Sequence, residues 1–191
     1  MKTIAAALVL GLSLLAAPAM ADAISINGDT TGDPTFNRAL TGAPPTGLSG
    51  LGTAVAYEVT AFTVSQAGSY DFLMTAIAPT NWDTYLHLYQ GAFNPAAALT
   101  NVLVGDDDHP TVGISGFSYN LAAGASYFAV ASGFENDDAG TYTLRISGPG
   151  AITVGAAVPE PASWALMILG FGAAGAMARL RRRGPGLAVP A

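Results

Sequence analysis

The chain has 191 residues, no cysteine and a formal net charge of −6 at pH 7. The absence of cysteine excludes disulfide bonds, thiol catalysis and cysteine-ligated zinc. Between residues 22 and 158, 12 acidic residues stand against two arginines, which gives this span a net charge of −10. A surface with this charge repels nucleic acid and attracts cations, so no nucleic-acid partner is expected.

The N-terminus has the pattern of a secretory signal peptide. Lys2 precedes an apolar run over residues 4–17, and small residues follow at Ala19 and Ala21. A basic start, an apolar middle and a small-residue site form the signal that export machinery reads and removes. The sequence therefore predicts a signal peptide over residues 1–21, with cleavage after Ala21, and export through the inner membrane.

The next segment, residues 22–53, is rich in Gly, Pro and Thr and has little hydrophobic periodicity. Such composition is typical of loops. We expect a loop-rich N-terminal segment with one edge strand near residues 24–26. Residues 22–158 as a whole have the length of one domain.

Residues 54–157 alternate apolar and polar side chains, which is the period of β-strands. Tyr70, Phe72 and Met74 alternate with residues 71, 73 and 75, and Leu144 and Ile146 alternate with polar neighbours. Turn residues separate the strands at spacings too short for crossover helices, which favours an antiparallel sheet arrangement. The sequence predicts an all-β, antiparallel β-sandwich with at most one helical turn, near residues 95–99.

One predicted strand carries aromatic rings at every second position. If Leu86 and Leu88 face the core, the alternate side chains face outward and form a platform on which a glycan ring can stack. Packing in the core is the commoner fate of such rings and remains the alternative. The candidate glycan platform consists of Trp82, Tyr85, His87 and Tyr89.

Two acidic clusters lie in turns between predicted strands. Calcium takes six to eight oxygen ligands, which loop carboxylates can supply. The first cluster, together with one aspartate from the start of a neighbouring strand, is the stronger candidate for a calcium site. For both clusters, the alternative interpretation is a solvated polar turn. The first set is Asp83, Asp106, Asp107 and Asp108, and the second is Glu135, Asp137 and Asp138.

Five segments of the body carry a family resemblance: GSYDF at 68–72, DTYLHLY at 83–89, the acidic 106–108, LAAGASYFAV at 121–130 and GTYTL at 140–144. With these segments, the body resembles the bacterial pre-peptidase C-terminal domain over about residues 55–147. The resemblance implies a jelly-roll-like β-sandwich with a non-catalytic accessory or binding role, and it makes calcium a candidate ligand.

The C-terminal region combines three features of a membrane signal. An uncharged apolar stretch over residues 162–178 has almost the length of a membrane-spanning helix. Arginines follow it and are expected to stay cytoplasmic, which leaves the upstream domain on the far side of the membrane. The arginines are Arg179, Arg181, Arg182 and Arg183.

A short motif stands at the start of this region and consists of Pro159, Glu160, Pro161, Trp164 and Ala165. With this motif, the apolar stretch and the arginines, residues 158–183 resemble the PEP-CTERM sorting signal of exopolysaccharide-producing Gram-negative bacteria, in its Pro-Glu-Pro-x-x-Trp-Ala variant. The resemblance implies processing by an exosortase and delivery to the cell surface or extracellular matrix. A short tail, residues 184–191, extends beyond the basic cluster, where such signals usually stop.

Together these patterns predict an exported, exosortase-sorted surface or matrix protein whose β-sandwich is a structural or binding component and not an enzyme. Exopolysaccharide is the candidate ligand. Two alternatives remain open at this point. One is a secreted hydrolase acting through a pair of acidic residues, and the other is a passive coat protein without a ligand.

Overall fold

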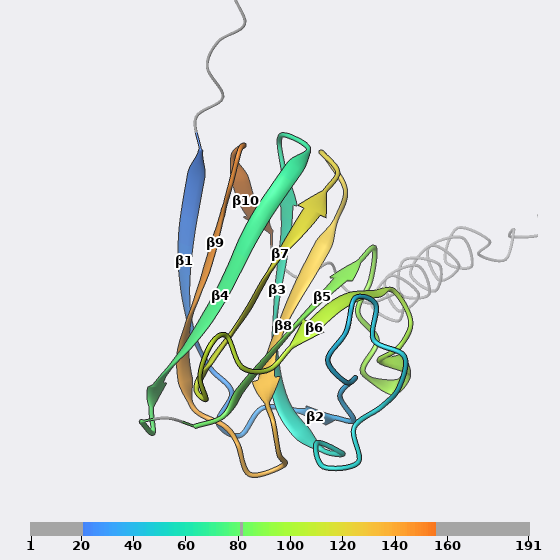
Figure 1. Cartoon of the computed structure of the whole chain (residues 1–191), viewed down its shortest axis with the longest axis vertical. Helices are drawn as coiled ribbons and strands as arrows, with labels where there is room; N and C mark the ends of the chain where they lie inside the picture. The colour runs from blue at the N-terminus through green and yellow to red at the C-terminus, as the bar shows by residue number, and fades with distance from the viewer. Residues whose placement is uncertain (1–20, 81, 156–191) are drawn as a thin grey trace, which may run out of the picture.

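The computed structural model describes residues 21–80 and 82–155, and these residues form two antiparallel β-sheets packed face to face (Figure 1). Residues 1–20 of the predicted signal peptide, the predicted membrane helix and the sorting motif lie outside the described residues. Within the described residues, no helix has the length and apolar character needed to cross a membrane. The elements are β1 Asp22–Asp29, β2 Thr35–Phe36, β3 Val55–Val64, β4 Gly68–Ala78, β5 Thr84–Gln90, the 3-10 turn η1 Pro95–Ala97, β6 Val102–Asp106, β7 Ile114–Leu121, β8 Tyr127–Gly133, β9 Thr141–Gly148 and β10 Ile152–Gly155.

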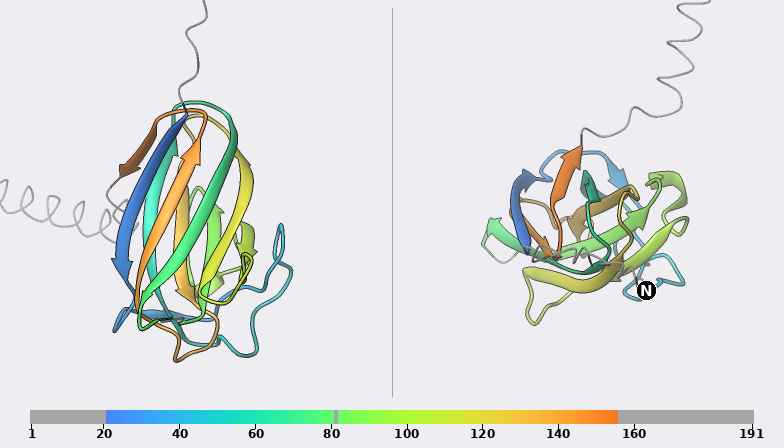
Figure 2. Two further views of the ribbon diagram at one scale, coloured as in Figure 1. Left: turned by 60° about the vertical axis from the view of Figure 1, so that its left-hand side comes forward. Right: turned by 90° about the horizontal axis from the view of Figure 1, so that it is seen from above.

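The first sheet has the strand order β1-β9-β4-β7, and the second has the order β10-β3-β8-β5-β6 with β2 added beside β3. All pairings are antiparallel. Figure 2 shows the two sheets lying face to face, and the buried side chains of the main core cluster pack between them. The predicted all-β sandwich is therefore confirmed, and the single turn expected near residues 95–99 is η1.

Strand β1 is the edge strand expected near residues 24–26, but it is eight residues long. It pairs with β9 from Asp22↔Gly148 to Asp29↔Thr141. Its side chains alternate between exposed and partly buried, and Ile24 and Ile26 pack against the core. The first strand of the N-terminal segment thus belongs to the sandwich itself, although its composition suggested loops.

The core between the sheets follows the predicted alternation in the first sheet. Tyr70, Phe72 and Met74 of β4 are buried, whereas Asp71 and Leu73 are exposed. Leu144 and Ile146, like Tyr142, are buried on β9. One face of this sheet meets the core and the other meets solvent, which is the condition that produces clean alternation in sequence.

Strand β5 departs from the prediction, because both of its faces are buried. Leu86 and Leu88 lie in the core between the sheets, as expected. Tyr85, His87 and Tyr89 point to the other side of the second sheet and are also at most 1% exposed. The expectation that only one face of this strand is buried is wrong.

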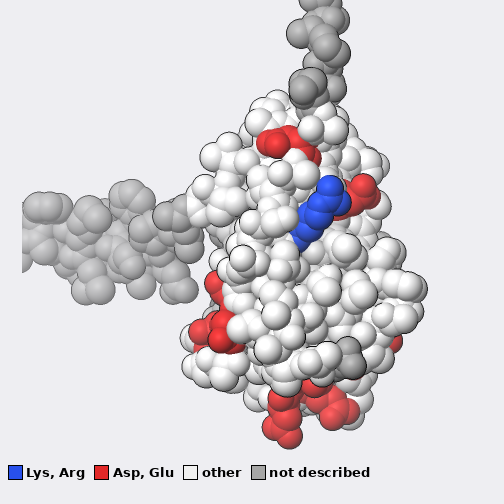
Figure 3. Space-filling model, turned by 90° about the vertical axis from the view of Figure 1, so that its left-hand side faces the viewer, with Lys and Arg blue, Asp and Glu red and all other residues white. Residues whose placement is uncertain are grey.

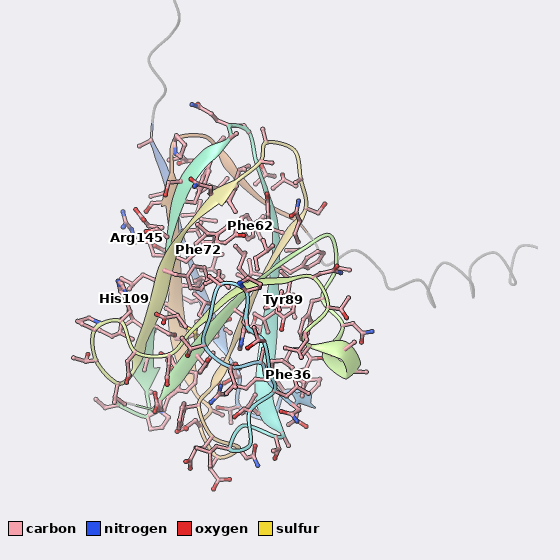
Figure 4. The ribbon with its side chains drawn as sticks, turned by 45° about the vertical axis from the view of Figure 1, so that its right-hand side comes forward. Phe36, Phe62, Phe72, Tyr89, His109 and Arg145 are labelled. Carbon is pink, nitrogen blue, oxygen red and sulfur yellow. The ribbon has the colours of Figure 1, made fainter. Side chains whose placement is uncertain are left out.

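A second apolar cluster covers that outer face of the second sheet. Phe36 from β2 and Ala98 beside η1 pack there against Tyr89, Phe128 and Val130. Phe36 and Tyr89 are labelled in Figure 4, apart from the pair Phe62 and Phe72 of the central core. The covering segments are loop-like, so hydrophobic periodicity in the sequence does not predict that they cover the sheet.

The covering segment is also fixed to the sheet by backbone hydrogen bonds. Gly42 and Gly105 exchange two of them, with N···O distances of 3.0 and 2.9 Å. A Cβ atom on Gly105 would lie 2.6 Å from Cδ2 of His87, so this approach requires glycine. The N-terminal segment therefore acts as a third layer over part of the second sheet.

Double burial of β5 predicts that both of its faces are sensitive to truncation. Leu86→Ala should lower the free energy of unfolding by about 2–5 kcal/mol, and Tyr85→Ala by a similar amount, because each leaves a cavity in a packed layer. Leu73→Ala, at an exposed position of β4, serves as the control and should cost less than about 1 kcal/mol. Denaturant melts measure all three, and a Tyr85→Ala variant as stable as the Leu73→Ala control would contradict double burial.

Candidate functional site

The start of one strand and the ends of two neighbouring strands of the second sheet lie together at one end of the sandwich. Antiparallel neighbours run in opposite directions, so the start of β5 lies beside the ends of β6 and β8. The registers Leu86↔Asp106 and Thr84↔Gly133 show this directly. The loops that precede or follow these ends carry most of the acidic residues singled out in the sequence.

The arrangement brings three carboxylates into one group. Asp83 directly precedes β5, and Asp107 and Asp108 directly follow β6. Each offers an oxygen atom, and the three oxygens lie within 4.8 Å of one another. Asp106 is not part of this group, because its Oδ2 faces the amide of Gly116 (3.4 Å) and Nδ1 of His109 (4.0 Å).

Two oxygens of this acidic group are buried without a hydrogen-bond partner among the described residues. They are Oδ1 of Asp83 and Oδ1 of Asp107. Buried polar atoms in folded proteins are almost always paired, and an unpaired one indicates a water, an ion or a functional demand. These oxygens are therefore the clearest sign of a cation position.

The pKa values of two members of the acidic group also favour a cation position. Burial raises the pKa of Asp83 to about 6, and the charges of Asp108 and Asp138 add to that rise while Arg38 opposes it. Burial likewise raises the pKa of Asp107 to about 6, with further contributions from Asp83 and Asp108 and opposition from Arg38. The ionised forms repel one another, and a divalent cation between them would remove that repulsion.

The second predicted cluster lies beside the first. Oδ1 of Asp138 accepts the amide hydrogen of Asp83 (3.4 Å), and its Oδ2 accepts that of Glu135 (2.8 Å). Asp138 therefore ties the β8–β9 loop to the start of β5. Glu135 and Asp137 are exposed. Figure 3 shows acidic side chains gathered at the lower end of the molecule, and further acidic side chains lie on the same face near the top, on the left and beside the blue basic side chain.

The candidate glycan platform is not on the surface. Trp82 is 5% exposed and donates from Nε1 to the Thr141 carbonyl oxygen (3.0 Å), and Tyr89 donates to that of Ala98 (2.9 Å). Trp82 packs in the central core, whereas Tyr85, His87 and Tyr89 lie under the covering segment. No ring of this set is available for stacking on a sugar, so core packing is the correct alternative.

A buried arginine, which the sequence analysis did not single out, organises this covering layer. The side chain of Arg38 is 1% exposed and donates to the Phe134 carbonyl oxygen from Nε (3.0 Å) and Nη2 (2.8 Å). Its guanidinium carbon lies 3.8 Å from the centroid of the Tyr85 ring, within cation–π distance. Arg38 is one of only two basic residues between 22 and 158, and that scarcity is the signal that could have identified it.

The ring of His87 stacks on the ring of Tyr85, with ring centroids 4.7 Å apart. Burial lowers the pKa of His87 to about 3, so the imidazole is neutral at physiological pH. Its Nε2–H donates to the Ala39 carbonyl oxygen (3.1 Å). A neutral, enclosed imidazole has a packing role, which agrees with the core alternative for this strand.

A pocket of about 370 Å³ opens beside the acidic group. This volume is at the lower end of the range for small-molecule sites. Asp107 belongs both to the pocket wall and to the acidic group, while the exposed Leu40 and Leu51 form part of the rim. At the wall, the hydroxyl groups of Thr41 and Tyr85 are hydrogen-bonded to each other at 2.7 Å. The pocket thus offers apolar rims together with hydroxyl and carboxylate groups.

Comparison with known families identifies the PEP-CTERM protein-sorting motif at residues 157–183. The resemblance of the C-terminal region is thereby confirmed, and the motif implies export and exosortase sorting. No curated protein matches the chain. None of the comparisons shows the pre-peptidase C-terminal resemblance, which stays a prediction.

Several solved β-sandwich structures are similar to the body at low scores. A CBM35 from Cellvibrio japonicus Abf62 is 11% identical, with a TM-score of 0.36, covering 71% of this chain and 100% of its own. A family 35 carbohydrate-binding module from an environmental isolate is 16% identical, with a TM-score of 0.38 and coverages of 70% and 99%. The K1 cleaved adhesin domain of Lys-gingipain from Porphyromonas gingivalis W83 is 17% identical, with a TM-score of 0.36 and coverages of 72% and 99%.

Proposed function

We propose that this protein is an exported, exosortase-sorted component of the cell surface or extracellular matrix, and that its β-sandwich is a non-catalytic binding module. The sorting motif at residues 157–183 supports the route. The observation that carries the binding role is the pocket beside the carboxylate group, with Asp107 common to both. Exopolysaccharide is the proposed ligand, because it is the polymer at the proposed destination.

Calcium is the cation proposed for the carboxylate group. Asp83, Asp107 and Asp108 supply hard oxygen ligands, as calcium prefers, and backbone carbonyls or water can complete the six to eight positions. Two of the three side chains have a buried oxygen that lacks a partner among the described residues. The residues present therefore fit the ion, and a cation there would offset the mutual repulsion that adds to the effect of burial on the two pKa values.

The pocket is the proposed position of a sugar unit. Leu40 and Leu51 can pack against the C–H face of a sugar ring, and the Asp107 carboxylate and the Thr41 hydroxyl can bond its hydroxyl groups. The Tyr85 ring is only 1% exposed and packs against Arg38 and His87. Binding at this pocket therefore relies on its rim and its polar groups, and not on aromatic stacking.

Capture of native matrix polysaccharide by residues 22–158 tests this function. We expect the unsubstituted protein to retain polysaccharide in calcium buffer, and Leu51→Asp to reduce retention at least fivefold by placing a charge on the rim. Leu99→Asp, at an exposed leucine outside the pocket, is the matched control and should bind normally. Equal retention by both variants would contradict the pocket, and release of soluble sugars would indicate the hydrolase alternative.

Calcium should stabilise the fold. At a hundredfold excess over the dissociation constant, an ion that binds only the native state contributes about 2.7 kcal/mol, and thermal melts with calcium and with chelator measure it. The calcium effect should weaken as pH falls through about 6, because protons then compete for Asp83 and Asp107.

Asp107→Asn separates the ion from the general charge of the domain. In chelator this variant should melt above the unsubstituted protein, because one source of repulsion is gone, and calcium should raise its midpoint little. Asp137→Asn, at an exposed position in the neighbouring loop, should keep the full calcium shift. Identical midpoints of the unsubstituted protein with calcium and with chelator would contradict the cation site.

The sorting route predicts the outcome of a change in the motif. Replacing Pro159 and Pro161 with alanine should leave a full-length, membrane-retained form, because the processing enzyme no longer recognises the triplet. Blots of cell fractions from a strain that has an exosortase measure this, with Pro185→Ala in the tail as the control. Unchanged size and distribution of the double variant would contradict sorting by this motif.

A further inference from the structure

The outer face of the first sheet is exposed and carries short side chains. Its two central strands, β9 and β4, place serine and threonine at most positions of this face. Each of the two strands also carries one charged residue there, Arg145 on β9 and Asp71 on β4, and both are exposed. Leu73 of β4 is 37% exposed and lies beside them. The middle of this face is therefore flat, with one pair of opposite charges and one leucine.

Arg145 is the only exposed basic side chain in the part of the chain that the structure describes, because Arg38 is buried. Within that part, Arg145 makes no hydrogen bond and no ion pair. In Figure 3 the blue basic side chain lies on the molecular surface with an acidic side chain beside it. Any attraction between this domain and an acidic group of a partner must therefore involve Arg145.

The register of β4 and β9 puts Asp71 at a diagonal position to this arginine. Asp71 lies opposite Ser147, and Leu73 lies opposite Arg145. Diagonal positions on neighbouring strands are about 7–8 Å apart. The Asp71 carboxylate accepts the hydroxyl hydrogen of Ser118 on β7, which holds it on the side away from β9. The two opposite charges are thus neighbours that are not paired with each other.

This arrangement is self-complementary. Asp71, Ser147, Arg145 and Leu73 occupy the corners of a rectangle, with the two charges on one diagonal. A two-fold axis in the plane of the face, close to the other diagonal, exchanges the two charged corners. Arg145 of each copy then faces Asp71 of the other copy, while Leu73 packs against Leu73 at the axis. Such a surface, on which the same residues meet in both directions, is the condition for an isologous contact.

We propose that this face, defined by Asp71, Leu73, Arg145 and Ser147, is a contact surface for a second copy of the chain. A second copy supplies one carboxylate and one guanidinium in matching register, so both charges of each face gain a partner. An anionic polymer would offer only carboxylates to a domain that is already strongly acidic, and charge repulsion disfavours it. The carboxylate group of Asp83, Asp107 and Asp108 belongs to loops of the second sheet and takes no part in the contact.

The size of the face indicates how strong the contact is. Its four strands are eight to eleven residues long. At the usual strand spacing and rise, they present roughly 19 by 27 Å, or about 500 Å² per copy. The two copies together would bury about 1,000 Å², which lies in the range of weak, transient interfaces. A covalent probe that captures the pair is therefore the suitable measurement.

Single cysteines test the contact in the full-length chain, which has no cysteine of its own. Ser147 lies close to the two-fold axis, so Ser147→Cys brings two thiols together across facing sheets that are about 10 Å apart. Ser25→Cys, on β1 of the same face, is the matched control, because its two copies lie roughly 14 Å apart along the interface by the same spacings. A bismaleimide of short reach should link Ser147→Cys into dimers at least fivefold faster than Ser25→Cys.

Reversal of the charges tests the pairing in the same Ser147→Cys chain. Arg145→Glu alone and Asp71→Arg alone should each reduce crosslinking at least fivefold, because like charges then face each other. A mixture of the two variants should restore it, since Glu faces Arg at both pairs. Asp137→Arg, at an exposed position of the β8–β9 loop, makes the same change in net charge as Asp71→Arg. It should crosslink normally by itself and should not rescue Arg145→Glu.

Restoration in the mixture also shows that both reversed variants are folded. Equal crosslinking of Ser147→Cys and Ser25→Cys, as association through another part of the chain would give, overturns the proposal. A mixture that links no better than its components overturns it as well. Reduced capture of polysaccharide by Arg145→Glu, with no crosslinking of Ser147→Cys, would assign the face to polysaccharide instead. The crosslinking itself requires neither calcium nor polysaccharide, so its outcome is separate from that of the proposed function.

Discussion

Burial of the second sheet on both faces is the constraint on which the rest of the structure depends. A two-layer sandwich of this size has one internal core, yet β5 also packs rings against a covering segment from the N-terminal region. The cover is held by Arg38, whose guanidinium bonds the Phe134 and Ala39 carbonyl oxygens and lies over Tyr85. Without this layer, three large side chains of β5 would face water.

The same cover creates the candidate site. Arg38, Leu40 and Leu51 of the segment form one side of the pocket, while Tyr85 of β5 and Asp107 after β6 form the other. Burial under this layer raises the pKa of Asp107, and the positive charge of Arg38 opposes that rise. The covering segment therefore contributes both to the packing of the second sheet and to the electrostatics of the site, and its loss would change both.

The sequence predicted those parts of the fold in which local pattern and tertiary environment agree. Strands β4 and β9 have one face in the core, so the alternation at Tyr70–Met74 and at Tyr142–Ile146 identified the buried face correctly. In β5 the same alternation wrongly predicted one exposed face, because the covering segment, which is distant in sequence, buries that face as well. The gathering of Asp83 with Asp107 followed from a simple antiparallel connection between two neighbouring strands. Arg38 contacts Tyr85 and Phe134, which lie 47 and 96 positions away in the sequence, and these residues also line the pocket. No local sequence pattern predicts such contacts.

The charge of the domain explains why a cation fits this architecture. With 12 carboxylates and two arginines between residues 22 and 158, repulsion acts against compaction, and the chain has no disulfide to oppose it. One of those two arginines is buried as a structural element and supplies only partial relief to the carboxylates at the end of the sandwich. A divalent ion between Asp83, Asp107 and Asp108 would neutralise charge where it is most concentrated and would connect the loops around β5 and β6. In a cysteine-free exported domain, such an ion would take the stabilising role that a disulfide has elsewhere.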